Sequence, residues 1–243
     1  AFFADEGLTV PVFIDINTGM NRTGILPEKA MELYRYASSL NGYTVKGGHV
    51  YDGHFRNPDF NERKKECDSA FTQIEALKRE IMQSGFAEPV IVAGGSPTFP
   101  IHAQRGNVEC SPGTFVYWDK GYADLCAEQP FETAAVLVTR VISVLSDGKI
   151  CTDLGHKSVA AENAIERRVF FLNAGPFKPA GQSEEHLVLE TPERHSYKVG
   201  DVFYALPYHI CPTVALYEKV FTATGGKITG SWKTVARDRS LTI

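Results

Sequence analysis

The pattern of hydrophobic residues along the chain changes near residue 128. In the first half, short apolar runs alternate with longer stretches in which apolar residues recur every three or four positions. The runs predict strands at 10–16, 44–51, 89–95 and 113–119, and the longer stretches predict helices at 27–40 and 61–85. Strands separated by helices of this length indicate βαβ units in a parallel sheet.

The second half is predicted to consist of strands and turns. Its short alternating runs, interrupted by Gly, Pro, Asp and Asn, are typical of an antiparallel β domain. The predicted strands lie within residues 133–145, 167–174, 185–190, 201–210, 213–223 and 230–243. We therefore expect two domains, an α/β domain over 1–128 and a mostly antiparallel β domain over 129–243. Four parallel strands do not close an eight-stranded barrel, so either the sheet is open or half of a barrel lies outside this chain.

Composition and charge narrow the classes of protein that fit the chain. Of its 243 residues, 43% are hydrophobic and 22% are charged, which is typical of a globular protein. The formal net charge of -4 gives no reason to expect nucleic acid or an anionic membrane as a partner. No apolar run is long enough to span a bilayer, and the first residues lack the features of a signal peptide. The five cysteines form no CxxC pair, which favours reduced thiols and a cytoplasmic location.

Polar residues gather after the predicted parallel strands, where ligands bind in α/β sheets and barrels. Arg22 follows the first strand in a loop flanked by glycine. Its guanidinium could stack on an aromatic ring or bind an anion, although a solvated loop arginine fits equally well. Tyr51 ends the second strand, where its ring could pack against a planar cofactor or simply belong to the core.

Two turns rich in small residues could bind phosphate. The motif GGSPT directly follows the third strand, and its backbone N–H groups and hydroxyls could surround an anion. The motif SPGT offers further N–H groups at the neighbouring strand. A tight turn without a ligand explains either motif alone, but the two loops together favour a phosphate-bearing ligand. The candidate residues are Gly94, Gly95, Ser96, Thr98, Gly113 and Thr114.

The segment LPYHICPT places His209 and Cys211 two positions apart near the end of a predicted strand. Residues i and i+2 of a strand project to the same side, so the imidazole and the thiolate could bind one metal ion such as zinc. Two protein ligands are too few for a structural zinc site and would leave positions open for water or substrate. A buried histidine beside a free cysteine is the alternative that this segment alone leaves open.

Taken in order, these motifs resemble one enzyme family. FIDINTGMNRTGI, HVYDGH, AGGSPTF and VECSPGTFVYWDKGYA resemble the barrel half of fold-type III enzymes that use pyridoxal 5'-phosphate (PLP). The downstream DLGHKS, LPYHICPT and WKTVARDR look like the D-threonine aldolase and D-serine dehydratase branch. Alanine racemases share the fold and the Gly-Met-x-Arg-x-Gly loop but lack the His-x-Cys pair. The resemblance covers essentially the whole chain and implies the later strands of a (β/α)8 TIM-type barrel followed by the β domain.

The resemblance also implies a role for each candidate residue. Arg22 would lie against the cofactor, and Tyr51 would lie near the face of its ring. The two small-residue turns would hold the phosphate. His209 and Cys211 would bind a divalent metal, for which the thiolate favours zinc. The metal would lie beside the β-hydroxyl of a D-amino acid substrate, and the enzyme would be a homodimer.

The lysine that forms the Schiff base with the cofactor in this family lies on the first barrel strand. This chain resembles the barrel only from about its middle, and Lys46, Lys120 and Lys157 do not lie at positions that suit the role. We therefore expect the catalytic lysine upstream of residue 1. The chain would then be the carboxyl-terminal portion of a longer polypeptide and would be inactive alone.

The activity implied is that of a PLP- and metal-dependent lyase acting on D-β-hydroxy amino acids. Metal-assisted departure of the hydroxyl would give dehydration, whereas its deprotonation would give cleavage to glycine and an aldehyde. His156 and Lys157 could assist as acid–base groups or belong to a surface turn. Two alternatives stay open: an amino acid racemase on the same fold that needs no metal, and a non-catalytic PLP-binding protein.

Overall fold

The computed structural model describes residues 2–175, 177–192 and 196–238. It contains two compact units, and each has an apolar core of its own. The first unit comprises Ala1–Phe115 and Leu125–Glu128, and the second comprises Val116–Asp124 and Gln129–Ile243.

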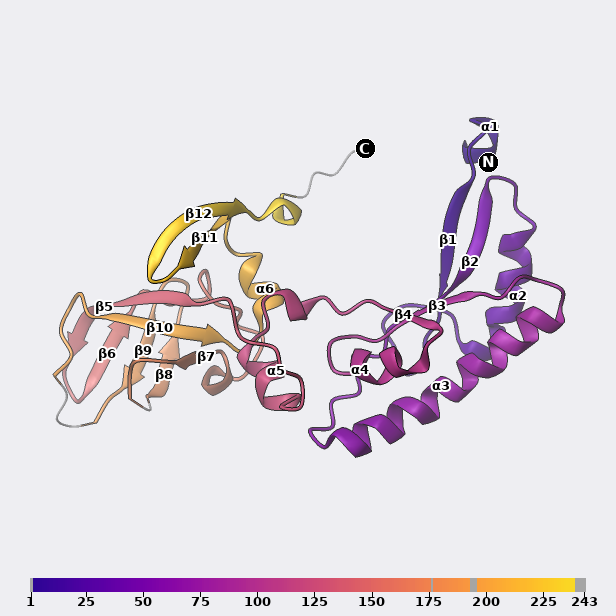
Figure 1. The fold of residues 1–243 in the computed structure, drawn as a ribbon. Coiled ribbons are helices and arrows are strands. Elements are labelled where there is room, and N and C mark those ends of the chain that lie inside the picture. The colour runs from indigo at the N-terminus through magenta and orange to yellow at the C-terminus, as the bar shows by residue number, and fades with distance from the viewer. Residues whose placement is uncertain (1, 176, 193–195, 239–243) are drawn as a thin grey trace. The chain divides into compact units, whose positions relative to one another are not determined.

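A four-stranded parallel sheet with the strand order β1-β2-β3-β4 forms the centre of the first unit. Each connection between successive strands passes through helical structure (Figure 1). The elements are α1 (Phe2–Asp5), β1 (Val10–Asp15), α2 (Pro27–Ser38), β2 (Tyr43–Val50), α3 (Phe60–Gln83), β3 (Val90–Ala93), α4 (Phe99–His102), the 3-10 helix η1 (Ala103–Arg105) and β4 (Val108–Cys110). Parallel strands in chain order, each followed by a helix, are the arrangement of part of a (β/α)8 barrel.

Local sequence explains where the two long helices begin. Pro27 occupies the first position of α2, where its missing N–H leaves no hydrogen bond unmade. The side chain of Asp59 caps α3 by accepting from the backbone N–H groups of Asn61 and Glu62, at 2.8 and 3.0 Å. The buried faces of both helices join the apolar core of this unit. That core consists of Ile14, Ile16, Ala30, Met31, Tyr34, Val50, Phe71, Ile74, Leu77, Ile81, Ile91 and Ala93.

The fourth strand lies earlier than the sequence predicts. β4 is Val108–Cys110, whereas the predicted strand at 113–119 contains the 3-10 helix η2 (Thr114–Val116). Pro112 has no N–H with which to join a ladder of hydrogen bonds, so the chain leaves the sheet before it. The strand prediction at 113–119 is therefore wrong, and the SPGT turn follows the carboxyl end of β4.

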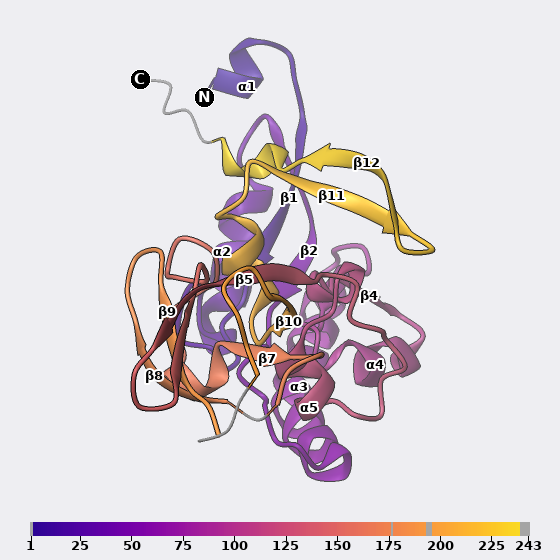
Figure 2. The same ribbon diagram turned by 90° about the vertical axis from the view of Figure 1, so that its left-hand side faces the viewer.

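The second unit contains a six-stranded antiparallel sheet with the strand order β7-β10-β5-β6-β9-β8. Figure 2 shows its strands curling around one another. The elements are α5 (Lys120–Leu125), β5 (Leu137–Leu145), β6 (Lys149–Thr152), η3 (Ile165–Arg167), β7 (Val169–Phe171), β8 (Lys178–Gln182), β9 (Leu187–Glu190), β10 (Val202–Pro207), α6 (Ile210–Val214), β11 (Lys219–Thr224), β12 (Lys227–Lys233) and η4 (Val235–Arg237). Strands β11 and β12 pair with each other as an antiparallel hairpin.

Alternation of side chains along β5 shows how this sheet forms a core. Leu137, Thr139 and Val141 are buried, and the residues between them are exposed. The buried side chains of β5, β6, β9 and β10 pack together. The core consists of Leu137, Val141, Ile150, Leu154, Val159, Val169, Leu187, Leu189, Phe203 and Ala205. The prediction of an antiparallel β region after the parallel sheet is therefore confirmed.

One predicted strand ends earlier than expected, at the segment with the candidate metal ligands. β10 ends at Pro207, and the chain then turns into the short helix α6 (Ile210–Val214). Pro212 lies in the first turn of that helix, where proline is tolerated. The predicted extended conformation is therefore wrong for Cys211, which lies in α6, whereas His209 keeps extended backbone angles just before the helix. Of the last predicted strand, 230–243, residues 239–243 lie outside the described part of the chain.

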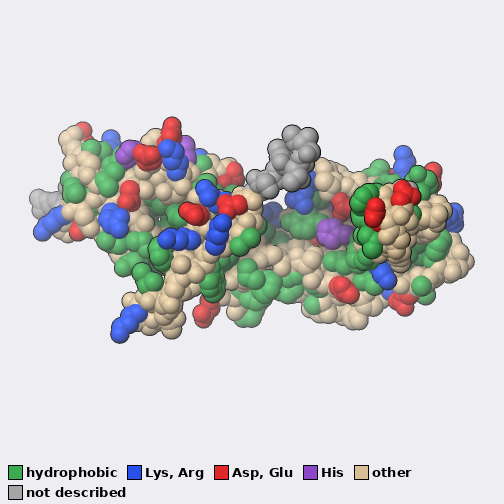
Figure 3. All heavy atoms as spheres, turned by 90° about the horizontal axis from the view of Figure 1, so that it is seen from above, with side chains coloured by type: hydrophobic (Ala, Val, Ile, Leu, Met, Phe, Trp, Pro, Cys, Tyr) green, Lys and Arg blue, Asp and Glu red, His purple; other side chains and the backbone are tan. Residues whose placement is uncertain are grey.

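The surface carries charges of both signs. On the face drawn in Figure 3, basic and acidic side chains are interspersed. Among the described residues, no helix combines the length and the apolar character that crossing a bilayer requires.

Candidate cofactor and metal sites

Arg22 and Tyr51 lie together beyond the carboxyl ends of β1 and β2. The Cζ atom of Arg22 lies 4.8 Å from the centroid of the Tyr51 ring, a cation–π contact. Asn17 shapes the loop that carries Arg22, because its side-chain oxygen accepts from the N–H groups of Gly19 and Asn21, each at 3.0 Å. The arginine is therefore placed on an aromatic face by an ordered loop.

A cavity of about 110 Å³ adjoins this arginine. Asp15 and His49 line it from neighbouring strands and lie 2.9 Å apart, carboxylate oxygen to Nδ1. Burial alone would raise the pKa of Asp15, but hydrogen bonds from Thr23 and His49 outweigh burial and lower it. The wall of the cavity therefore carries a negative charge beside the positive Arg22. The lining residues are Asp15, Ile16, Asn17, Met20, Arg22, Thr23, His49 and Tyr51.

The loop after β3 needs its first two glycines. Gly94 has a φ of +92°, and a Cβ there would lie 2.8 Å from the Cα of Phe99. A Cβ at Gly95 would lie 3.0 Å from the Tyr51 ring, so this loop runs directly beside the aromatic side chain.

The GGSPT and SPGT turns lie in contact, as binding of one phosphate by both turns requires. The backbone N–H of Thr114 donates to the Ser96 hydroxyl oxygen at 3.3 Å. A Cβ at Gly113 would have no heavy atom within 4 Å, so the second turn faces open space. Thr98, in contrast, is fully buried, and its hydroxyl donates to the carboxylate of Asp52.

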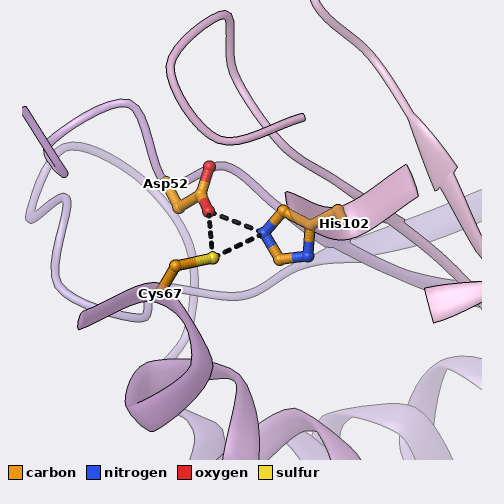
Figure 4. Close-up of side chains that lie close together, drawn as sticks. All are labelled: Asp52, Cys67 and His102. Atoms are coloured by element: carbon orange, nitrogen blue, oxygen red, sulfur yellow. Dashed lines mark hydrogen bonds and ion pairs between the residues drawn. The ribbon is translucent and has the colours of Figure 1, made fainter. Parts of the chain in front are cut away.

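Asp52, Cys67 and His102 form a buried cluster beneath this loop that the sequence patterns do not reveal (Figure 4). His102 Nε2 lies 2.8 Å from Asp52 Oδ2 and 3.3 Å from Cys67 Sγ. The other carboxylate oxygen of Asp52 accepts from Gly95 N at 3.1 Å. The only sequence signal is Asp52 itself, which is the second residue after β2. Cys67 lies on α3 and His102 on α4, so no spacing rule connects the three.

Carboxylate, thiolate and imidazole are all zinc ligands, and the three ligand atoms lie within 4.8 Å of one another. The tautomer of His102 argues against a metal there. Arg105 Nε always carries a proton, and it donates to His102 Nδ1 at 3.2 Å. His102 Nε2 therefore carries the ring proton and donates to Asp52, which leaves no lone pair for a metal. The cluster is a hydrogen-bonded support for the loop.

The charges within the cluster follow from this arrangement. Burial alone would raise the pKa of Asp52, but hydrogen bonds from His102, Thr98 and Gly95 outweigh it and lower the pKa. Burial, together with the nearby Asp52 charge, raises the pKa of the Cys67 thiol to about 12. Cys67 is consequently a neutral thiol at physiological pH and not a nucleophile.

In the second unit, the start of a helix, and not a strand, brings His209 and Cys211 close together. His209 is the N-cap residue of α6, with extended backbone angles, and Cys211 lies in the first turn. The carboxylate of Asp119, only 1% exposed, holds this turn by accepting from the N–H of Ile210 at 3.0 Å. It also accepts from Tyr122 N at 2.8 Å, which fixes α5 beside α6.

The imidazole of His209 contacts two acceptors. A hydrogen bond with Cys211 is the largest cause that raises the pKa of His209 to about 9, and a second comes from Glu162. The distance from His209 Nδ1 to Glu162 Oε1 is 2.5 Å. The Cys211 side chain is exposed, so the pair can be reached from solution. Sequence reasoning identified the pair but missed Glu162, which lies 47 positions from His209.

The three lysines weighed for the Schiff base, and His156, which was considered with Lys157 for an acid–base role, lie at exposed or partly exposed positions. Lys157 makes ion pairs with Glu184 and Glu185, at 2.9 and 3.0 Å, and its side chain is 59% exposed. His156 Nε2 lies 3.5 Å from an Arg168 nitrogen. Lys120 pairs with Asp124 one helical turn away. Lys46 is also exposed, on β2. These contacts favour the surface-turn interpretation of His156 and Lys157.

Two family models cover most of the chain. The family described as "Alanine racemase, N-terminal domain" matches residues 3–120, and "Putative serine dehydratase domain" matches residues 134–223. Among curated proteins, 3-hydroxy-D-aspartate aldolase of Paracoccus denitrificans (strain Pd 1222) is 23% identical over 246 residues, which is 96% of this chain and 62% of that protein. D-threonine aldolase of an Arthrobacter species is 24% identical over 95% of this chain and 62% of its own length.

Solved structures show the same fold. D-threonine aldolase from Filomicrobium marinum superposes with a TM-score of 0.86 at 24% identity, over 96% of this chain and 64% of that one. The chain therefore has the fold of alanine racemase-like proteins and is a relative of the D-threonine and 3-hydroxy-D-aspartate aldolases. The fold-type III resemblance and the α/β plus β fold class are confirmed. The chain spans a little less than two thirds of the length of these relatives.

The residues of the first unit fit a planar group that carries a phosphate. Tyr51 and Arg22 offer a flat aromatic and cationic surface, and Gly95 and Gly113 leave backbone without side-chain bulk. Two buried atoms in the loops after β1 and β2, Thr18 Oγ1 and His54 Nδ1, have no hydrogen-bond partner among the described residues. Such unmade bonds cost about 1–3 kcal/mol each, which a polar ligand would offset. In the second unit, the nitrogen and sulfur donors fit zinc.

Proposed function

We propose that this chain belongs to a PLP- and metal-dependent lyase that acts on D-amino acids with a β-hydroxyl group. The observation that carries the proposal is the His209–Cys211 pair. It is held at the start of α6 by the buried Asp119, and its thiol side is open to solution. The sequence similarity to D-threonine aldolase and 3-hydroxy-D-aspartate aldolase supports the reaction class.

The first unit would bind the cofactor. Tyr51 and Arg22 would face the ring, and the loops around Gly95 and Gly113, with the Ser96 hydroxyl, would surround the phosphate. When bound, PLP supplies an electron sink for the carbanion formed at the substrate Cα. Asp52 would keep the phosphate loop in place through its hydrogen bonds to Gly95 and Thr98.

The second unit would bind the metal. His209 Nε2 and the Cys211 thiolate would be its protein ligands and would leave positions open for the substrate oxygen. Zinc bound there supplies a Lewis acid that polarises the β-hydroxyl. Dehydration and retro-aldol cleavage both suit these two ligands, and the relatives include enzymes of both kinds.

Metal removal tests the proposal. The protein from its full reading frame is loaded with PLP and assayed with D-threonine, D-serine and 3-hydroxy-D-aspartate before and after chelation. We expect turnover to fall at least about 100-fold without metal and to return when zinc or manganese is added. His209→Ala should show the same low rate with or without added metal. Turnover that is indifferent to both chelation and His209→Ala would contradict the proposed metal role and favour a racemase-type mechanism.

A further inference from the structure

Glu162 contacts the candidate metal ligand His209 from a different segment of the second unit. Its carboxylate oxygen Oε1 lies 2.5 Å from His209 Nδ1, across 47 positions of sequence. Neither residue belongs to a named helix or strand. The contact therefore depends on how the surrounding loops are fixed.

Two hydrogen bonds tie the segment before Glu162 to α6. The Thr213 hydroxyl donates to the carbonyl oxygen of His209 at 2.7 Å. The same hydroxyl oxygen accepts from the backbone N–H of Ala160 at 3.2 Å. Thr213 is buried, so this bridge is protected from solvent. Glu162 follows Ala160 by two residues, so the bridge holds the backbone of Glu162 near His209.

Stability alone gives little reason for this pair. The side chains of His209 and Glu162 are 42% and 45% exposed. Ion pairs that are exposed to this extent contribute about 0–1 kcal/mol. The arrangement has a clearer chemical consequence: a carboxylate that accepts from Nδ1 keeps a proton on that nitrogen, so a metal that binds the ring displaces the proton of Nε2. Metal-binding histidines commonly have such a partner on the other ring nitrogen.

We propose that Glu162 is a positioning residue of the metal site, which fixes the His209 ring and its tautomer so that Nε2 binds the metal. This inference rests on the proposed function, in which His209 and Cys211 are the metal ligands. Glu162 and the Cys211 thiolate together carry two negative charges, which balance a divalent cation. Glu162 does not touch the metal itself in this arrangement, because its contact is with the opposite ring nitrogen.

Zinc affinity tests the inference. Isothermal titration with zinc sulfate is carried out on the unaltered protein and on Glu162→Ala, Glu162→Gln and Glu166→Gln. Glu166 is an exposed glutamate four residues along the same segment, and Glu166→Gln therefore removes the same charge nearby. We expect Glu162→Ala to weaken zinc binding by about 10–100-fold. Glu162→Gln keeps an oxygen that can accept from Nδ1 and should recover part of that loss, and Glu166→Gln should bind like the unaltered protein.

The tautomer is read directly by long-range 1H–15N spectra of the zinc-loaded, 15N-labelled protein, with the His209 signals assigned from a His209→Gln spectrum. The unaltered protein should show a proton on Nδ1 and zinc on Nε2. Glu162→Ala should show a mixture of the two coordination modes.

The outcomes distinguish a failure of the proposed metal site from a failure of the role proposed for Glu162. No zinc binding by the unaltered protein would overturn the proposed metal site itself. Zinc binding that Glu162→Ala leaves unchanged, or weaker binding with an unchanged tautomer, would leave the metal site standing and overturn the role of Glu162.

Discussion

The carboxylate of Asp52 accepts hydrogen bonds from the loop that the proposal assigns to phosphate binding, through Gly95 N–H and the Thr98 hydroxyl. His102 donates to its second oxygen. A buried carboxylate in such a setting is held ionised by its donors, and the donors in turn depend on the charge. The Asp52 side chain thus helps to hold this loop in place.

Acid unfolding measures this contribution. The folded pKa of Asp52 is lowered, so the stability that it supplies is present above the unfolded value of about 3.9 and is lost as pH falls through the folded pKa. We expect Asp52→Asn to reduce the free energy of unfolding by about 1–3 kcal/mol at pH 7, measured with urea. The difference from the unaltered protein should shrink near pH 3.

Glu80→Gln, which removes a charge from the exposed face of α3, is the control and should change little at either pH. A difference between Asp52→Asn and the unaltered protein that is the same at pH 7 and pH 3 would contradict the ionised state of Asp52.

At the scale of elements, the long periodic segments are those that sequence predicts well. Strands β1, β2 and β3 and helices α2 and α3 lie within a few residues of their predicted ranges, because the two helices have long apolar patterns and the strands are the short runs between them. α6 was missed, since a helix of five residues is too short to show a helical period. β8 was missed because Pro179 and Gly181 weaken its strand pattern.

In the candidate metal site, too, some residues could be predicted from the sequence and others could not. His209 and Cys211 are close in sequence, so their proximity could be predicted even though the conformation between them was not. Glu162 and Asp119 reach the same turn from 47 and 91 positions away. Only the folded chain shows such contacts, because no local pattern encodes them.

Substitution by alanine should affect stability differently at two glycines of the first unit. A Cβ at Gly47 would lie 1.8 Å from the carbonyl oxygen of Val90, so Gly47→Ala must push β2 and β3 apart. We expect it to lower the free energy of unfolding by about 3 kcal/mol or more. Gly113→Ala meets no heavy atom within 4 Å and should leave stability within about 0.5 kcal/mol.

Under the proposed function, the added methyl group at Gly113 would lie in the phosphate cradle and weaken PLP binding. Urea unfolding and equilibrium dialysis with PLP measure the two effects separately. A Gly113→Ala protein that binds PLP as tightly as the unaltered protein would contradict the assignment of this turn to the phosphate.

At the scale of the whole molecule, each of the two proposed binding sites is built within one compact unit. The cofactor residues lie on loops of the parallel sheet, and the metal residues lie at the start of α6 beside the antiparallel sheet. Similarity to the aldolases extends along nearly the whole chain and thus includes both units. The account therefore requires PLP binding and metal binding by the same protein.

The central claim is tested most directly by the absorption spectrum of the protein from its full reading frame, after incubation with PLP and removal of the excess. The account predicts a visible band from bound cofactor that changes on addition of D-threonine or D-serine and not on addition of L-serine. A protein that retains no band after removal of the excess, or whose band is unaffected by D-threonine, D-serine and 3-hydroxy-D-aspartate alike, would contradict a PLP-dependent lyase.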